Sequence, residues 1–395
     1  MSARTSLYGT RSDTPDTVSY DGVGHVLPSS SASNRRLKGG VFVELNEHIP
    51  AYINGISAGT YRDLRTQFTP LVDHIHNNLE KSQINAHHFD HQDRVAHGTF
   101  QMGQMLDLNP QDVAAVTLAT RFHDIGYIFK KGIDPRTLSK RNSPELRNHP
   151  RQGAEIFLET LRNEMRRNVM MKFELAWWTD RHSELAFDAI RHHSNGSDYE
   201  PEDVHIAAKL PRLFDKADND RRRNFSSHIE EVRQAATLRP EDAASIAGRY
   251  EHANVLASDY MNQFDRVQYK TASDVFAALQ AFDQGFAHRL APYAAEGQRI
   301  IWDPNRGEMV FEYDVDLQKL SMLLGVPMEP GHHVHLFEKA YGNSSMPIAA
   351  EVVQSIRRHI GLPVAAAEPG VTVRFNFDHD HTIERSYLPE QEQHD

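Results

Sequence analysis

Adjacent His123 and Asp124, at the end of an apolar stretch, are the residues of this 395-residue chain best suited to metal chemistry. An imidazole nitrogen and a carboxylate can both bind a transition metal, and one carboxylate can bridge two ions. Further histidines and aspartates recur at wide intervals on either side of the pair. These further candidate ligands are His91, His149, His192, His193 and Asp215. Imidazoles and carboxylates in this number predict a dinuclear site for divalent metals.

Five segments around these residues resemble, in order, the motifs of the HD superfamily of metal phosphohydrolases, and most closely its HD-GYP branch. HQDRV (91–95) resembles the opening motif, ATRFHDIGY (119–127) the His-Asp motif, and HPRQGAEI (149–156) the next one. AIRHHSNG (189–196) resembles the histidine-pair segment, and DKAD (215–218) the closing motif. The resemblance covers about residues 85–225 and is specific because several separate segments match in order.

The resemblance implies a helical HD domain that holds two metal ions. His91, His123, Asp124 and Asp215 would bind one ion, and Asp124, His149, His192 and His193 the other. Mn, Fe, Co, Ni or Zn would suit these ligands. Such a pair of ions, bridged by Asp124, lowers the pKa of a bound water and neutralises charge on phosphoryl oxygens. The expected reaction is hydrolysis of a phosphate ester.

Other residues would act on the substrate. Asp218, expected one helical turn beyond Asp215, would orient the water or protonate the leaving oxygen, and Asn219 would contact the substrate. With Asp124, these two complete the predicted catalytic set. The candidate phosphate contacts share a positive charge and are Arg94, Lys130, Lys131, Arg222 and Arg223.

The chain departs from the HD-GYP pattern in places that concern the substrate. Tyr127 replaces the lysine that follows His-Asp-Ile-Gly, and only scattered elements of the Gly-Tyr-Pro loop occur over residues 196–201. His87 stands where branches with a third metal have a glutamate, which favours two metals. The DKADN run also resembles the alarmone hydrolases, another HD branch, with Asn219 at their asparagine position. The expected substrate is therefore a nucleotide, a cyclic nucleotide or a cyclic dinucleotide. The branch of the HD superfamily is left open.

Several alternatives stay open at this point. His97 is an alternative to His91 as the first ligand. Some HD proteins with this ligand order hold a di-iron centre that activates oxygen, and a nucleotide-sensing regulatory protein is a third function class. His332, His333 and His335 could bind metal from alternate strand positions, although a structural role is favoured. Trp177 and Trp178, with Phe173, are expected in the core or in the wall of a lid.

The element pattern predicts a mainly α fold, an HD-domain helical bundle with a small C-terminal α+β appendage. Residues 1–40 are rich in small polar residues and are expected to be a disordered tail. Helical spacing dominates the HD domain, 41–295, and places the ligands near helix starts or ends. In the C-terminal region, 296–395, a strand, turn and strand are expected over 299–315, a helix over 346–360 and a strand over 371–377.

Composition narrows the partners of the chain. It has no cysteine, which excludes disulfides and thiolate ligands. With 43 basic and 54 acidic residues its net charge is −11, which argues against broad binding to duplex nucleic acid. No apolar run is long enough for a membrane span. A phosphate-containing small molecule is the expected partner, and no membrane partner is expected. The cytoplasm is the expected location, and a homo-oligomer remains open.

Overall fold

The structure is a computed structural model of the whole chain. It describes residues 40–43, 45, 52–53, 56–82, 89–127, 148–194, 204–219, 287, 291–324, 328–342, 345–364, 369–378 and 381–389. All of these lie in one compact unit, Leu37–Asp395. The expected tail therefore lies outside the described residues, apart from its last position. The expected domain boundary near residue 296 stays a prediction.

The part of the chain in which an HD domain is expected is helical, as predicted. Its helices are α1 (Ala58–Ser82), α2 (Phe89–Met105), α3 (Pro110–Thr120), α5 (His149–Arg167), α6 (Val169–Glu174), α7 (Asp180–Arg191) and α8 (Ile206–Ala217). α3 illustrates why they form, since the Asn109 side chain accepts hydrogen bonds from two backbone N–H groups of its first turn and Pro110 pre-sets the backbone. From Asp112 to its end α3 is buried on every side, and it packs against α2 and α7.

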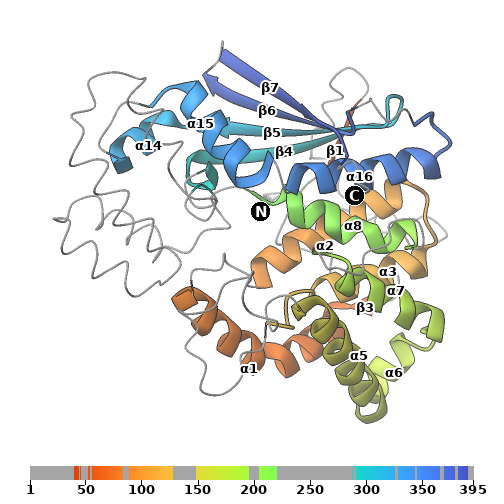
Figure 1. Cartoon of the computed structure of the whole chain (residues 1–395). Coiled ribbons are helices and arrows are strands. Elements are labelled where there is room, and N and C mark those ends of the chain that lie inside the picture. The colour runs from red at the N-terminus through yellow and green to blue at the C-terminus, as the bar shows by residue number, and fades with distance from the viewer. Residues whose placement is uncertain are drawn as a thin grey trace, which may run out of the picture. The chain divides into compact units, whose positions relative to one another are not determined.

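The C-terminal region is a mixed sheet with helices against it (Figure 1). Its strands are β1 (Val41–Val43), β4 (Ala295–Asp303), β5 (Glu308–Val315), β6 (Val371–Asp378) and β7 (His381–Tyr387), in spatial order β1-β4-β5-β6-β7. β5 and β6 are parallel and the other neighbours antiparallel. A parallel pair needs a crossover, which α14 (Leu317–Leu324), α15 (Pro330–Phe337), the π-helix η3 (Glu338–Gly342) and α16 (Ser345–His359) provide. A separate hairpin joins β2 (Tyr52–Ile53) and β3 (Ile56–Ser57).

The predicted fold class, mainly α with a small C-terminal α+β region, is confirmed. The strands expected over 299–315 and 371–377 and the helix over 346–360 all form. The strand interpretation of the 332–335 histidines is wrong, because Pro330 starts a helix there and Glu329 caps it. The sheet also takes a strand from residues 41–43, which the sequence pattern had placed with the helices.

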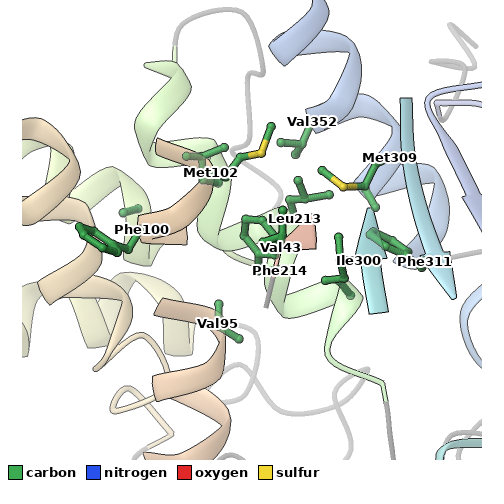
Figure 2. Close-up of a cluster of buried hydrophobic side chains, with 14 of the residues drawn as sticks. Val43, Val95, Phe100, Met102, Leu213, Phe214, Ile300, Met309, Phe311 and Val352 are labelled. Carbon is green, nitrogen blue, oxygen red and sulfur yellow. The ribbon is translucent and has the colours of Figure 1, made fainter. Parts of the chain in front are cut away.

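One apolar core joins the helices to the sheet. Figure 2 shows Val95, Phe100 and Met102 of α2 and Leu213 and Phe214 of α8 in one cluster with Ile300, Met309, Phe311 and Val352 from the sheet and α16. Gly98 permits the close approach of α2 to α8, because a Cβ there would lie 2.6 Å from the Phe214 ring. α8 packs against both α2 and α16, so this core fixes the helix that carries Asp215.

No helix in the described ranges has both the length and the apolar character needed to cross a membrane.

Candidate metal centre

His123 lies just past the C-terminus of α3, where the chain leaves the helix. Its Nδ1 donates a hydrogen bond to the Thr120 carbonyl at 2.7 Å. This bond places the proton on Nδ1. The lone pair of Nε2, on the opposite side of the ring, is then available to bind a metal. His123 and Asp124 are both buried, at 0% and 1% exposure. The local turn thus presents one imidazole nitrogen and one carboxylate to the interior.

The two carboxylate oxygens of Asp124 face different histidine pairs. Oδ2 lies 3.1 Å from Nε2 of His123 and 3.8 Å from Nε2 of His91. Oδ1 lies 3.4 Å from Nε2 of His193 and 3.9 Å from Nε2 of His149. Two groups of possible metal ligands result. The first is His91, His123 and Asp124, and the second is Asp124, His149 and His193. Within each group the ligand atoms lie within 4.8 Å of one another. This is the arrangement expected of a carboxylate that bridges two ions.

His149 is the first residue of α5 and is held from two sides. Tyr127 stacks on its ring, with centroids 3.8 Å apart and an angle of 12° between the planes. Gly126 allows the backbone of α5 to approach, because a Cβ on Gly126 would lie 1.8 Å from the His149 carbonyl oxygen. The small residue after His-Asp-Ile therefore sets the distance between this turn and the start of α5.

His193 follows the end of α7 and completes the second group. Its Nδ1 donates to the Ile190 carbonyl at 2.5 Å, which directs Nε2 to the centre. There it lies 3.2 Å from Nε2 of His149. His192 is not part of either group among the described residues. Its Nε2 lies 3.8 Å from the Asp188 carboxylate, on its own helix.

His91 is held by a buried carboxylate. Its Nδ1 lies 2.6 Å from Oδ2 of Asp218, and Arg94 donates to both oxygens of the same carboxylate, with Nη2 at 2.9 Å from Oδ2. Arg94 and Asp218 are both 0% exposed. Although burial alone would raise the pKa of the Asp218 carboxyl, Arg94 and His91 hold it far below its usual range. Asp218 therefore accepts these bonds as a carboxylate.

These contacts favour different roles for Asp218 and Arg94 from those expected. α8 ends at Ala217, so Asp218 is the cap and not a continuation of the helix. Its carboxylate lies behind His91 and orients it, a contact typical of residues that support a metal ligand. Arg94 balances that carboxylate, which favours a structural role over phosphate contact. Asn219 is buried and its amide donates to the Lys216 carbonyl, which favours a role in closing the end of α8.

Asp215 adjoins the first group from the last turn of α8. Its Oδ1 lies 3.2 Å from Nε2 of His91 and 3.9 Å from Nε2 of His123. Oδ2 binds the Lys216 ammonium at 2.6 Å. Asp215 can thus add an oxygen ligand beside His91 and His123, as expected from its position in the sequence. Lys130, Lys131, Arg222 and Arg223 lie outside the described residues.

The charges around the centre suit a cation. Burial opposes the charged form of His123, but the Asp124 carboxylate outweighs it and raises the imidazole pKa. Burial lowers the pKa of His193, which keeps that imidazole neutral and able to donate an electron pair. Nε2 of His123 is buried, and the group that faces it is Oδ2 of Asp124, 3.1 Å away. A metal ion bound by this nitrogen and this oxygen would satisfy both buried atoms.

Comparison with known proteins agrees with this geometry. Residues 88–222 match the HD domain. The matched range contains every residue of the two ligand groups, together with His192 and Asp215, and an HD domain with these buried histidines and aspartates indicates a metal-dependent phosphohydrolase. The match is to the HD domain in general and does not distinguish the HD-GYP branch. No curated protein and no solved structure matches the chain.

Sequence reasoning missed the contacts that hold the ligands in place. The stacking of Tyr127 on His149 could not be predicted, because it joins two segments 22 residues apart whose contact no local pattern indicates. A signal for Arg94 was present, since a charged residue one turn after His91 on the same helix face can reach whatever His91 contacts.

Proposed function

We propose that this protein is a phosphohydrolase that uses two divalent metal ions and acts on a nucleotide or a cyclic nucleotide or dinucleotide. The observation that carries the proposal is the orientation of the Asp124 carboxylate. One of its oxygens faces His91 and His123, and the other faces His149 and His193. Two bound ions would activate a water and offset negative charge on the phosphoryl oxygens.

The chain's own residues supply the donors and hold them in place. His91, His123 and His193 each present Nε2 to the centre, because their Nδ1 atoms are engaged by Asp218, Thr120 and Ile190. Preorganised donors of this kind need little rearrangement when metal binds. Asp215 joins the first group, and Tyr127 holds the His149 ring. We keep His192 as a proposed ligand of the second ion, which would require its ring to turn from Asp188.

The proposed substrate is supported by the HD domain and by the cations that follow two of the candidate ligands in the sequence. The candidate phosphate contacts Lys130 and Lys131 follow the His-Asp turn, and Arg222 and Arg223 follow α8. Each pair begins seven residues after a candidate ligand, His123 or Asp215, a length of chain that could bring it to a phosphate at the centre. Asn219 stays a proposed substrate contact only if its amide leaves the Lys216 carbonyl.

The decisive experiment combines metal analysis with a hydrolysis screen. The purified full chain is analysed for transition metals and then assayed for phosphate or nucleotide release on a panel of mononucleotides, cyclic nucleotides and alarmones. Asp124→Ala is the negative control. Two metals with turnover that Asp124→Ala abolishes would support the proposal.

Two other results would assign the alternative classes. Two irons that consume oxygen, with no phosphate release, would assign the di-iron oxygenase class. Tight nucleotide binding without turnover in a metal-loaded protein would assign a sensor. Either result would overturn the hydrolase proposal while leaving the metal centre in place.

A further inference from the structure

The short helix α6 exposes an unusual amount of apolar side chain. Val169, Met170 and Phe173 are 78%, 65% and 78% exposed, and they are half of the exposed large hydrophobic residues in the described part of the chain. Phe173 was expected in the core or in the wall of a lid, and the first of these two expectations is wrong. A surface helix normally turns polar residues outward, so three apolar residues on one exposed face indicate a binding surface.

α6 is rigidly attached despite its exposure. Met171 and Leu175 are fully buried beneath it, and Trp177 and Trp178 pack partly against the core just after it. The Asn168 side chain caps its first turn through two backbone N–H groups. At its other end the Glu174 carboxylate accepts bonds from Ser57 and Thr60 at the start of α1. The apolar residues are thus presented by a fixed element.

The charge next to these residues is positive in a chain whose net charge is −11. Between residues 162 and 174 every exposed charged residue is a cation, namely Arg162, Arg166, Arg167 and Lys172. Of the two acids in the same stretch, Glu164 is buried, with Oε1 4.0 Å from Nη1 of Arg167, and Glu174 is bonded to α1. Asp63, an exposed acid that reaches this stretch, accepts a bond from the Asn168 amide at 2.7 Å. We call Val169, Met170, Phe173 and the four cations the α6 patch.

We propose that the α6 patch docks on an anionic membrane surface. Side chains exposed by 65–78% project into the solvent, as apolar residues that insert into a lipid interface do. Projecting apolar residues flanked by arginine and lysine suit the boundary between charged lipid headgroups and acyl chains. A second copy of the chain is disfavoured because a symmetric contact would bring the four cations together. The proposal concerns surface attachment and is independent of the hydrolase proposal.

Vesicle co-sedimentation of the full chain tests the proposal. We expect binding to vesicles of phosphatidylcholine mixed with phosphatidylglycerol and much weaker binding to phosphatidylcholine alone. Met170→Ser with Phe173→Ser should abolish most binding. Arg166→Gln with Lys172→Gln should lower it by roughly tenfold or more, because each cation near an anionic surface contributes several-fold to partitioning.

The controls are matched in residue type and lie outside α6. Leu388→Ser removes an apolar side chain that is 41% exposed elsewhere, and Arg306→Gln removes a cation whose side chain is 75% exposed. Both should bind vesicles like the parent protein. Thermal unfolding should be unchanged in all variants, since every substituted side chain is exposed.

Three results would overturn the proposal. Equal binding to the two kinds of vesicle would show that anionic lipid is not required. Unchanged binding by the Met170/Phe173 variant would show that the α6 patch is not the membrane-binding surface. A dimer in sedimentation velocity that this variant dissociates, without vesicle binding, would assign the patch to a second copy of the chain.

Discussion

Asp218 accepts a 2.6 Å hydrogen bond from Nδ1 of His91, 127 residues earlier in the chain. The same carboxylate accepts hydrogen bonds from Arg94, so one buried residue both orients a candidate metal ligand and neutralises a buried cation. We infer from this relationship that Asp218 positions His91 in the first ligand group. It also changes the expected effect of its substitution, from a loss of proton transfer to a loss of metal.

We predict that Asp218→Asn weakens metal binding by about 10–100-fold, as found when the partner of a metal-bound histidine is removed. The variant also leaves Arg94 buried without its counter-charge, which is destabilising by about 3–5 kcal/mol. The double variant Asp218→Asn/Arg94→Gln removes both charges and should fold better while still binding metal weakly. Metal titration followed by elemental analysis measures the affinity.

Asp112→Asn is the matched control, because its buried carboxylate also lies between an arginine and a histidine, Arg181 and His182, and this histidine is in neither ligand group. It should keep the parent's metal affinity. If the folded double variant binds metal like the parent but loses turnover, Asp218 acts on the substrate or the water, as the sequence alone suggested.

Substitution of Asp124 should remove both metals, and substitution of Asp215 only one. Asp124 contributes to both ligand groups, whereas Asp215 adjoins only His91 and His123. Elemental analysis of Asp124→Ala and Asp215→Asn should therefore give close to no metal and about half of the parent's load. An unchanged load in Asp124→Ala would reject the bridging assignment.

His91, and not His97, should be required for metal binding. His97 lies on the same helix, but its Nε2 is 3.2 Å from the Gln101 amide and it belongs to neither ligand group. His91→Ala should lose metal from the first group, while His97→Ala should keep the full load. The opposite result would mean that the register of α2 relative to the centre is wrong.

Gly126→Ala should destabilise the fold and displace His149. The added Cβ would lie 1.8 Å from the His149 carbonyl oxygen and 2.5 Å from the Gly153 nitrogen, both backbone atoms that cannot move alone. We expect a loss of about 2 kcal/mol or more in the free energy of unfolding. Gly331→Ala is the control, because a Cβ at Gly331 meets nothing within 4 Å. Urea unfolding of the two variants should separate them clearly.

His333 should make the folded state less stable as the pH falls. Burial lowers its pKa to about 4, although its ring nitrogen Nε2 donates to the Ala291 carbonyl at 3.1 Å. An unfolded histidine titrates near about 6.5, so the unfolded chain binds the proton first as the pH falls. The stability due to neutral His333 is thus full above about pH 6.5 and declines between there and pH 4.

The decline should approach about 1.4 kcal/mol per pH unit within that window. His333→Gln cannot titrate but can still donate to the Ala291 carbonyl. Its stability should therefore depend less on pH between 6.5 and 4 than that of the parent, as measured by urea unfolding at several pH values. Parallel pH profiles for the two proteins would contradict the assignment to His333.

The sequence by itself determined the kinds of ligand and the local elements that carry them. His123, Asp124 and His149 lie at helix ends, as the proline positions and the helical spacing predicted. These features are local, because the apolar spacing of a helix and the residues that cap it can be recognised from neighbouring positions in the sequence. The strands β4, β5 and β6 and the helix α16 were predictable for the same reason.

Only the tertiary structure decided what those ligands contact. Asp218 was expected one helical turn beyond Asp215, but α8 ends at Ala217, whose carbonyl accepts a hydrogen bond from Tyr313 of β5, 96 residues further on. β1 likewise pairs with β4 across most of the chain. Such contacts depend on the packing of segments that are distant in sequence, and no local pattern encodes them. The direction of a single carboxylate, and with it the role of Asp218, follows from that packing.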